Sequence, residues 1–349
     1  MLLMNRRVFS AGLAAGAAGI PTGASAQAQR YKLLLNTSYS GPVSFFLLAE
    51  DRGYLREAGL DIAFSPGEGA AAIIPQVKAG NFDIGYGDIT ALIERIARGA
   101  PNEGPVAIYT TFNSVPFTIA VPADSPIRSP KDFEGRTISG HPVDAALITF
   151  DMFARANGVD ASKVNVVESP AAMGNQVADM LKGKGAQGVF GFVNTIIASV
   201  APLGIDGRKE LRFLNYADHL PDMYGNTLFV TRELYRSNPQ ALSGMVRAFN
   251  RALADTAKEP DVAIEALVRR DPTIRRDVNR TRLVGTLSSE MAHPEGRRIG
   301  VGDMEDARLG RLIALIVETK KLPRTPSVRE VFDRSFLPPD RERIRSLGA

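Results

Sequence analysis

The sequence predicts an α/β protein with two lobes, each a mostly parallel sheet flanked by helices. Residues 36–98 repeat a strand, turn and helix pattern three times. Such alternation requires crossover connections, which place the strands in parallel and the helices on both faces. The same pattern restarts near Arg136. With 349 residues, 44% of them apolar, the chain is long enough for two cores.

The first three strands are expected at Lys32–Asn36, Leu60–Phe64 and Phe82–Tyr86, and each ends in a turn that begins a helix. Pro42 suits the first position of a helix, because its missing N–H would have no partner there. In parallel sheets, ligands bind beyond the carboxyl ends of the strands, where helix N-termini present free N–H groups. We therefore expect the three turns to surround one site and to contribute Ser38, Ser40, Gly67, Gly69 and Asp88.

These segments also carry a resemblance. The runs SGPVSFFLLAEDRGYLREAGLDIAF and GEGAAAIIPQVKAGNFDIGYGD resemble the first lobe of the periplasmic solute-binding proteins of ABC importers, in the group that takes sulfonates, taurine, nitrate and the pyrimidine precursor of thiamine. The later runs FTIAVPADSPIRSPKDFEGRTIS and YGNTLFVTRELYRSNPQALSGMVRAFNRALADTAKEPDVAIEAL fit the same pattern in order. The resemblance implies a type II periplasmic binding protein, a monomer that closes over a small-molecule ligand and delivers it to an inner-membrane ABC permease with its ATPase.

The resemblance also implies how the chain is divided. Residues 27–118 and 225–349 are expected to form a discontinuous first lobe, and residues 119–224 a second lobe between two hinge crossings. The helices after residue 238 are expected to return to the first lobe and to carry little of the ligand site.

The second lobe opens with the same element as the first. A strand at Arg136–Ser139 leads into a turn with Pro142 and then a helix, so this turn is the counterpart of the first-lobe turns across a cleft. Pro142 and Asp144 are therefore candidate ligand contacts, as is Asn194 at a later helix start. Asp88 and Asp144 each have two interpretations: a plain N-cap, or a cap that also accepts a hydrogen bond from a ligand.

Aromatic residues in irregular chain beside the turns are the candidates for stacking on a flat ligand. Tyr39 and Tyr224 fit this description best. Phe45 and Phe46 lie 100° apart on one helix, so they cannot both face the core, and Phe46 is the candidate for the cleft mouth. Asn113 follows the next strand and is the last candidate ligand contact.

Composition excludes several kinds of chemistry. The chain has no cysteine, which rules out disulfides, a thiolate nucleophile, an iron–sulfur cluster and a lipid-bearing cysteine. The net charge is only +4 and no basic cluster with interleaved aromatics occurs, so a nucleic-acid partner is not expected. The three histidines are far apart in sequence, so no metal site is expected. The run Gly67–Ala72 matches G-x-G-x-x-A but follows the second strand, so we interpret it as a glycine turn and expect no cofactor.

The amino terminus has the features of an export signal. Residues 1–26 contain Arg6 and Arg7, then Phe9, a weakly apolar Ala/Gly segment, and small residues that end at Ala26. This pattern is typical of a signal peptide of the twin-arginine type, with the general route as the alternative. No run of 18 apolar residues follows, so the mature chain is expected in the periplasm without a membrane span.

The predicted turns contain acids and aromatics but no lysine or arginine. Glu68, Asp88 and Asp144 beside aromatic rings favour a nitrogen heterocycle or another aromatic ligand over a sulfonate or nitrate. An alkanesulfonate, taurine or nitrate ligand is the alternative. A rival from another class is the thiamine-pyrimidine synthase on the same fold. That family carries a cysteine-rich motif, which this chain lacks, so we expect no enzyme activity. A ligand sensor that docks on a membrane receptor is a further alternative.

Overall fold

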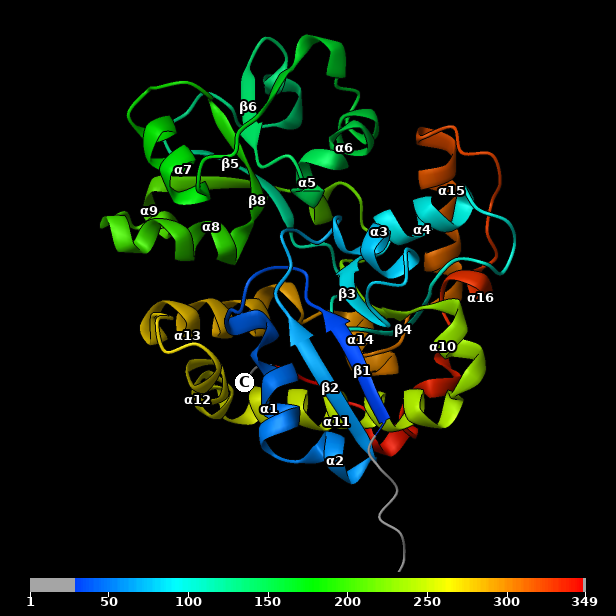
Figure 1. The fold of residues 1–349 in the computed structure, drawn as a ribbon. Helices are drawn as coiled ribbons and strands as arrows, with labels where there is room; N and C mark the ends of the chain where they lie inside the picture. The colour runs from blue at the N-terminus through cyan, green and yellow to red at the C-terminus, as the bar shows by residue number, and fades with distance from the viewer. Residues whose placement is uncertain (1–28, 348–349) are drawn as a thin grey trace, which may run out of the picture.

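The computed structural model describes residues 29–347, which form two parts that lie one above the other in Figure 1, each built around a five-stranded sheet. We call the parts around these sheets the first and second lobes. The expected signal peptide lies outside the described residues. Among residues 29–347, no helix is both long and apolar enough to cross a membrane.

The first lobe is built on a sheet with the strand order β2-β1-β3-β10-β4. The strands β1 and β2 and the strands β1 and β3 pair in parallel, whereas β10 is antiparallel to both β3 and β4. The strand bounds are Gln29–Leu34 for β1, Leu60–Ser65 for β2, Ile84–Asp88 for β3, Val106–Thr110 for β4 and Asn226–Val230 for β10.

The second lobe repeats this arrangement in the order β7-β6-β8-β5-β9. Here β6 pairs in parallel with β7 and β8, and β5 is antiparallel to β8 and β9. The bounds are Phe117–Pro122 for β5, Thr137–Gly140 for β6, Asn165–Glu168 for β7, Gly188–Phe192 for β8 and Leu211–Asn215 for β9.

Both sheets are mixed, not mostly parallel as the sequence analysis expected. The reason lies in the two crossings. The chain leaves the first sheet after β4 and returns at β10, and β5 and β10 are the first strands after each crossing. Each of them enters its new sheet between two strands that run the opposite way. Two of the four pairings in each sheet are therefore antiparallel.

Helices cover both faces of each sheet (Figure 1). The first-lobe helices before the crossing are α1 at Ser44–Asp51, α2 at Tyr54–Glu57, α3 at Ile73–Lys78 and α4 at Ile89–Ala97. The second-lobe helices are α5 at Ala145–Ile148, α6 at Phe150–Ala156, α7 at Met173–Leu181, α8 at Val193–Val200 and α9 at Gly207–Glu210.

The remaining helices follow the return to the first lobe. They are α10 at Arg232–Ser237, α11 at Pro239–Lys258, α12 at Pro260–Arg270, α13 at Arg276–Gly285, α14 at Pro294–Ile299, α15 at Asp306–Thr319 and α16 at Val328–Val331, with a π-helical turn at Thr286–Glu290 after α13. The helices α11 and α12 pack on α1 of the first lobe. In addition, α13 contacts α8 and α15 contacts α6, so this block also meets the second lobe.

One buried ion pair holds both crossings in place. The guanidinium of Arg308 on α15 bonds the carboxylate of Glu295 at 2.7 Å, and both side chains are more than nine-tenths buried. The same guanidinium donates to the carbonyl of Asn113, just before β5, at 2.7 Å. It also donates to the carbonyls of Pro221 and Met223, just before β10, at 3.1 and 2.9 Å. Both interlobe segments are thus anchored to one side chain.

We expect Arg308→Ala to destabilise the protein by about 3–5 kcal/mol, because it leaves the Glu295 carboxylate buried without its cation. Arg311→Ala is the matched control, since Arg311 lies on the same helix in an exposed pair with Asp222 and should contribute about 0–1 kcal/mol. Urea unfolding of both variants measures the difference. Equal free energies of unfolding would contradict the role given to Arg308.

A buried carboxyl group lies where β3 ends and α4 begins. Asp88 caps α4, as its position in the sequence predicts, and its Oδ1 accepts the N–H of Ala91 at 2.9 Å. The side chain is buried, and its Oδ2 has no hydrogen-bond partner among the described residues. Burial raises the pKa of Asp88 to about 7, although the amides of Ala91 and Thr90 act in the opposite direction. The folded protein therefore holds a proton here that the unfolded chain releases near its ordinary pKa of 3.8.

This carboxyl should make stability fall as the pH rises from about 4 to about 7, because over that range the folded state binds more protons than the unfolded state. Asp88→Asn keeps a capping oxygen and removes the charge. We expect the variant to lose this part of the pH dependence and to exceed the wild type at pH 8.5 by at most about 4 kcal/mol.

Urea unfolding at pH 5 and pH 8.5 checks the expectation for Asp88. Asp124→Asn, at an exposed position, serves as the control and should leave the wild-type pH profile unchanged. If Asp88→Asn and the wild type lost equal stability between the two pH values, the buried proton would be ruled out.

Candidate ligand-binding cavity between the lobes

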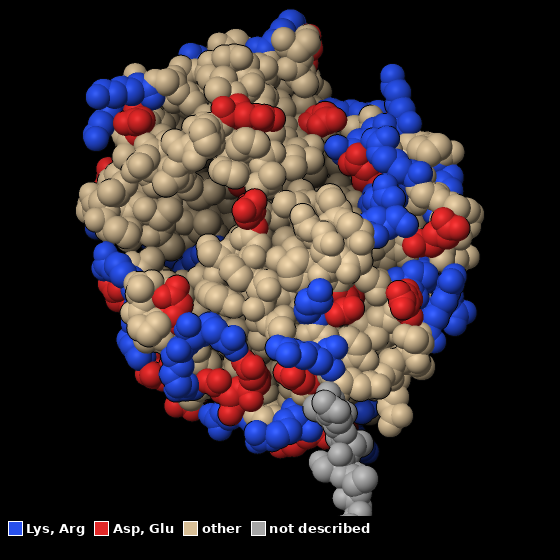
Figure 2. All heavy atoms as spheres, in the orientation of Figure 1, with Lys and Arg blue, Asp and Glu red and all other residues tan. Residues whose placement is uncertain are grey.

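A cavity of about 150 Å³ lies between the lobes and is lined from both. A single water needs roughly 10–15 Å³ by the same measure, so the cavity can hold a small organic molecule. The surface is hollowed between the second lobe and α13, and basic side-chain atoms are visible in the hollow (Figure 2). The first-lobe lining is Asn36, Thr37, Pro42, Glu68, Gly69, Ala70, Tyr86, Phe112, Asn226, Arg282 and Glu290; the second-lobe lining is His141, Val143, Asp144, Ala145, Met173, Phe192 and Thr195.

The turns that follow parallel strands supply much of this lining. Thr37 lies beyond β1, Gly69 beyond β2 and Val143 beyond β6. Gly69 has a φ of +154°, and a Cβ at this position would lie 2.7 Å from the carbonyl oxygen of Val143. Glycine is therefore needed here for its backbone conformation and for the close approach of the two lobes. The turns of the two lobes touch at this point.

Aromatic and apolar side chains form most of the walls. Tyr86 and Phe112 contribute from the first lobe, and Phe192 and Met173 from the second. The hydroxyl of Tyr86 shares a 2.6 Å hydrogen bond with Thr111, which leaves the ring as its contribution to the cavity. Flat apolar walls with a few polar groups are typical of sites for small organic ligands.

Some polar groups at the cavity have no partner. The side chains of Asn36 and Asn226 are buried, and the Oδ1 atom of each lacks a hydrogen bond among the described residues. Buried polar atoms are nearly always paired, so these amides are available to a ligand. Asp144 caps α5 through a 2.8 Å bond from the N–H of Ala146, and burial raises its pKa to about 6.

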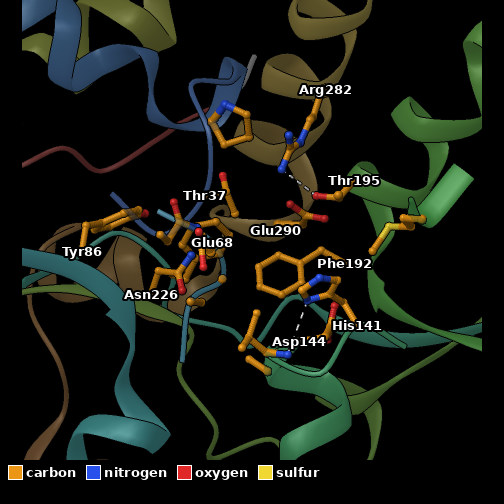
Figure 3. A pocket seen from close by; sticks show the side chains of 18 residues that line it. Thr37, Glu68, Tyr86, His141, Asp144, Phe192, Thr195, Asn226, Arg282 and Glu290 are labelled. Atoms are coloured by element: carbon orange, nitrogen blue, oxygen red, sulfur yellow. Dashed lines mark hydrogen bonds between the residues drawn. The ribbon is translucent and has the colours of Figure 1, made fainter. Parts of the chain in front are cut away.

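The C-terminal helices contribute more to this cavity than the sequence analysis expected of them. Arg282 of α13 and Glu290 of the π-helical turn both line the cavity (Figure 3). The physical reason is that α13 packs across the cleft on α8. Arg282 Nη2 donates to Thr195 Oγ1 at 2.8 Å, and Glu290 Oε1 accepts the backbone N–H of Asn194 at 2.9 Å. These bonds link the first lobe to the second.

The surroundings of Arg282 and Glu290 shift the pKa values of both side chains. Burial raises the pKa of Glu290 and lowers the pKa of Arg282. The nearby Glu290 carboxylate opposes the shift at Arg282. Arg282 Nε is buried and has no hydrogen-bond partner among residues 29–347. The guanidinium of Arg282 therefore has an N–H group that can donate a hydrogen bond to a ligand.

Of the residues that the sequence analysis proposed, Gly69 and Asp144 line the cavity. Asn194 lies at its edge, where its Nδ2 also donates to Ser289 at 3.1 Å. The remaining candidates lie outside the lining, and they are Ser38, Tyr39, Ser40, Phe46, Gly67, Asp88, Asn113, Pro142 and Tyr224.

Packing explains several of these positions. Phe45 and Phe46 are both fully buried, contrary to the expectation, because Phe46 packs between the sheet at Phe64 and α11 at Phe249. The hydroxyl of Tyr39 donates to the carbonyl of Phe64 at 3.0 Å. Tyr224 and Asn113 instead bond Glu295, at 2.7 and 3.1 Å, in the network around the crossings.

The other candidates lie close to the lining. Gly67 packs on the backbone of Leu35, Ser40 is buried, and Ser38 and Pro142 are exposed on the turns beside lining residues. His141 is exposed and also lines the cavity. No group of three or more His, Cys, Asp or Glu side chains in the described range could hold a metal ion.

The solved structures that match the fold include two sulfonate-binding proteins. The alkanesulfonate-binding protein SsuA from Xanthomonas axonopodis pv. citri, bound to MOPS, has a TM-score of 0.64 at 16% identity and covers 88% of this chain and 98% of its own. The periplasmic aliphatic sulphonate binding protein SsuA from Escherichia coli has a TM-score of 0.65 at 14% identity and covers 89% and 94%. The two-lobed periplasmic binding protein fold is thereby confirmed.

Sequence comparison adds a family. A 4-amino-5-hydroxymethyl-2-methylpyrimidine phosphate synthase of Legionella pneumophila is 24% identical over 253 residues, which are 70% of this chain and 75% of that protein. A family model described as NMT1/THI5 like matches residues 42–263, more than half of the chain. The chain therefore belongs to the NMT1/THI5-like family.

Proposed function

We propose that this protein is the periplasmic solute-binding component of an ABC importer. It captures a small organic ligand, with a nitrogen heterocycle or another aromatic compound favoured, and passes it to a permease with its ATPase. The observation that carries the proposal is a cavity lined from both lobes, with direct bonds between the lobes at its edge.

The mechanism is closure at the crossings. A ligand that touches both lobes only in the closed state binds that state better and shifts the population towards it. The segments before β5 and β10 are both fixed on Arg308, so this side chain defines a common pivot for the movement. No bond in the ligand is broken.

The composition of the cavity supports an aromatic or heterocyclic ligand. Three rings form its walls, and the Asn36 and Asn226 amides and the Asp144 carboxylate can accept N–H groups. The alternative, an alkanesulfonate, taurine or nitrate, is supported by Arg282 and by the sulfonate-binding proteins of the same fold.

The location and partners follow from this function. A leader at residues 1–26 directs the protein to the periplasm, where it is a monomer that docks on its permease. Export by the twin-arginine route remains part of the proposal. The periplasmic Escherichia coli neighbour supports this location.

The curated relative favours a second candidate, a synthase that makes a thiamine pyrimidine. Purified protein incubated with a small-molecule extract of bacterial cells would test this. Mass spectrometry would then detect formation of 4-amino-5-hydroxymethyl-2-methylpyrimidine phosphate if the synthase were correct.

The solute-binding function predicts that one compound class both stabilises and compacts the mature protein. A thermal-shift screen would include aminopyrimidines, nucleobases, aromatic acids, sulfonates and nitrate. At about 100 times its dissociation constant, a ligand should add about 2.7 kcal/mol of stability. Small-angle X-ray scattering with the same compound should show a smaller radius of gyration. Binding without compaction would reject the closure mechanism.

Gly285 provides a variant that opposes closure while leaving the fold intact. A Cβ at this position would lie 2.1 Å from Asn194 Oδ1 across the cleft, so Asn194 would have to turn away and lose its bond to Ser289. Loss of a hydrogen bond of about 1 kcal/mol weakens binding about fivefold. Gly285→Ala should therefore lower ligand affinity by at least that factor, without lowering stability, because alanine favours a helix.

Gly310→Ala on α15 is the matched control for Gly285→Ala. A Cβ there meets only Val328 at 3.8 Å, an ordinary contact, so affinity should be unchanged. Calorimetric titration of both variants with any ligand from the screen provides the comparison. An unaltered affinity in Gly285→Ala would show that binding does not require this contact between the lobes.

A further inference from the structure

We propose that the ligand of this cavity is an aromatic or heteroaromatic carboxylate, that Arg282 binds its carboxylate group, and that the same guanidinium couples binding to closure through Thr195. The inference rests on the proposed function and specifies the ligand class for the same cavity.

The first step is the state of Arg282. Its guanidinium points from α13 towards the cavity and the second lobe (Figure 3). Nη2 bonds Thr195, whereas Nε is buried without a partner in the described part of the chain. A buried donor without a partner costs about 1–3 kcal/mol. Donating this N–H to an oxygen of a ligand would therefore lower the free energy of the complex.

The neighbouring arginines show that this state is particular to Arg282. On or next to α13, Arg275, Arg276 and Arg280 each form an ion pair with a carboxylate on the surface. Arg282 forms no ion pair within 4.0 Å among residues 29–347, even though Glu290 lies in the same cavity.

Glu290 is held by other donors. Its Oε1 accepts the Asn194 N–H, and its Oε2 accepts the Thr286 hydroxyl at 2.9 Å. The two carboxylate oxygens of Glu290 therefore accept hydrogen bonds from groups other than Arg282. The N–H of Arg282 Nε can consequently donate to an acceptor on a ligand.

The second step is the shape of the acceptor. A guanidinium presents planar N–H groups that match the two oxygens of a carboxylate. Among the lining residues, Arg282 is the only arginine or lysine, so one planar acid group fits the available positive charge. Tyr86, Phe112 and Phe192 supply flat walls for a ring attached to that group. A free nitrate would leave these walls without contacts.

The third step is orientation. Arg282 lies at one side of the cavity, and Asn226 and Tyr86 lie at the opposite side (Figure 3). The unpartnered Oδ1 atoms of Asn36 and Asn226 can accept N–H groups from the far end of the ring. The Asp144 carboxylate, which lies away from Arg282 in Figure 3, repels an acid placed beside it. The carboxylate is thereby directed to Arg282.

The fourth step connects binding with closure. Arg282 belongs to the first lobe and Thr195 to α8 of the second, so their bond exists only when the lobes are together. A carboxylate on Arg282 fixes the guanidinium between its ligand and Thr195. Loss of the Thr195 hydroxyl should therefore weaken closure while the preference for an acid is kept.

The test compares acids and neutral relatives of the same ring. The probes are benzoate, nicotinate, nicotinamide and benzenesulfonate, each titrated calorimetrically into the mature protein. In the wild type we expect nicotinate and benzoate to bind at least tenfold more tightly than nicotinamide, and more tightly than benzenesulfonate. Equal affinity for acid and amide, or tighter binding of the sulfonate, overturns the proposal without the use of any variant.

Variants then locate the acid group. Arg282→Gln should lose at least tenfold in affinity for nicotinate and little for nicotinamide. Arg280→Gln, on the same helix but paired with Asp261 on the surface, should stay within twofold of the wild type. Thr195→Val should keep the preference for the acid and lose most of the compaction in small-angle scattering. Wild-type affinity for acids in Arg282→Gln overturns the assignment of Arg282.

The outcomes also separate this inference from the proposed function. Binding and compaction with neutral heterocycles alone reject the carboxylate and leave the solute-binding function in place. An absence of binding by every probe rejects the carboxylate class. If the wider screen also yields no compound that stabilises and compacts the protein, the solute-binding function is rejected as well.

Discussion

The buried ion pair between Arg308 and Glu295 is the interaction on which the two-lobed arrangement depends. Two chain segments connect the lobes, and they bond each other through the N–H of Gly225 and the carbonyl of Phe112 at 3.1 Å. Arg308 donates hydrogen bonds to backbone carbonyls on both segments. Glu295 accepts hydrogen bonds from the side chains of Tyr224 and Asn113, which lie on the same two segments. Such a buried pair is expensive to desolvate, so it stabilises only when every donor and acceptor is satisfied. Here the backbone of the crossings supplies the missing partners.

The fixed crossings explain why the cavity can be made from distant parts of the chain. Turns after β1, β2 and β6 meet because the carboxyl ends of parallel strands in both sheets face the cleft. The C-terminal helices then bring α13 against α8. A side chain has no room at Gly69 against Val143 or at Gly285 against the side chain of Asn194, so the lobes meet closely at these two places.

The sequence predicted the elements better than the side chains of the site. The helix Ile89–Ala97 begins directly after the predicted N-cap at Asp88, and the helices expected after residue 238 begin with Pro239–Lys258, where a proline occupies the first turn. In the turns, the residues that line the cavity are often one or two positions away from the predicted candidates. Glu68, for example, lines the cavity, whereas its neighbour Gly67 does not. The backbone conformation of a turn determines which side chain faces inward. The hydrophobic periodicity and the residue spacing of the sequence do not predict that conformation.

The position of Arg282 in the cavity could not be predicted from the sequence. It lies on α13 among other arginines, and nothing in its local sequence distinguishes it from Arg280 two residues earlier. Its role depends on the docking of α13 against α8, which is a long-range contact. Without that cation, acids and rings in the turns favour a ligand that only donates hydrogen bonds. With it, the cavity has acceptors at one side and a guanidinium at the other, which favours a ligand with both N–H groups and an acid group.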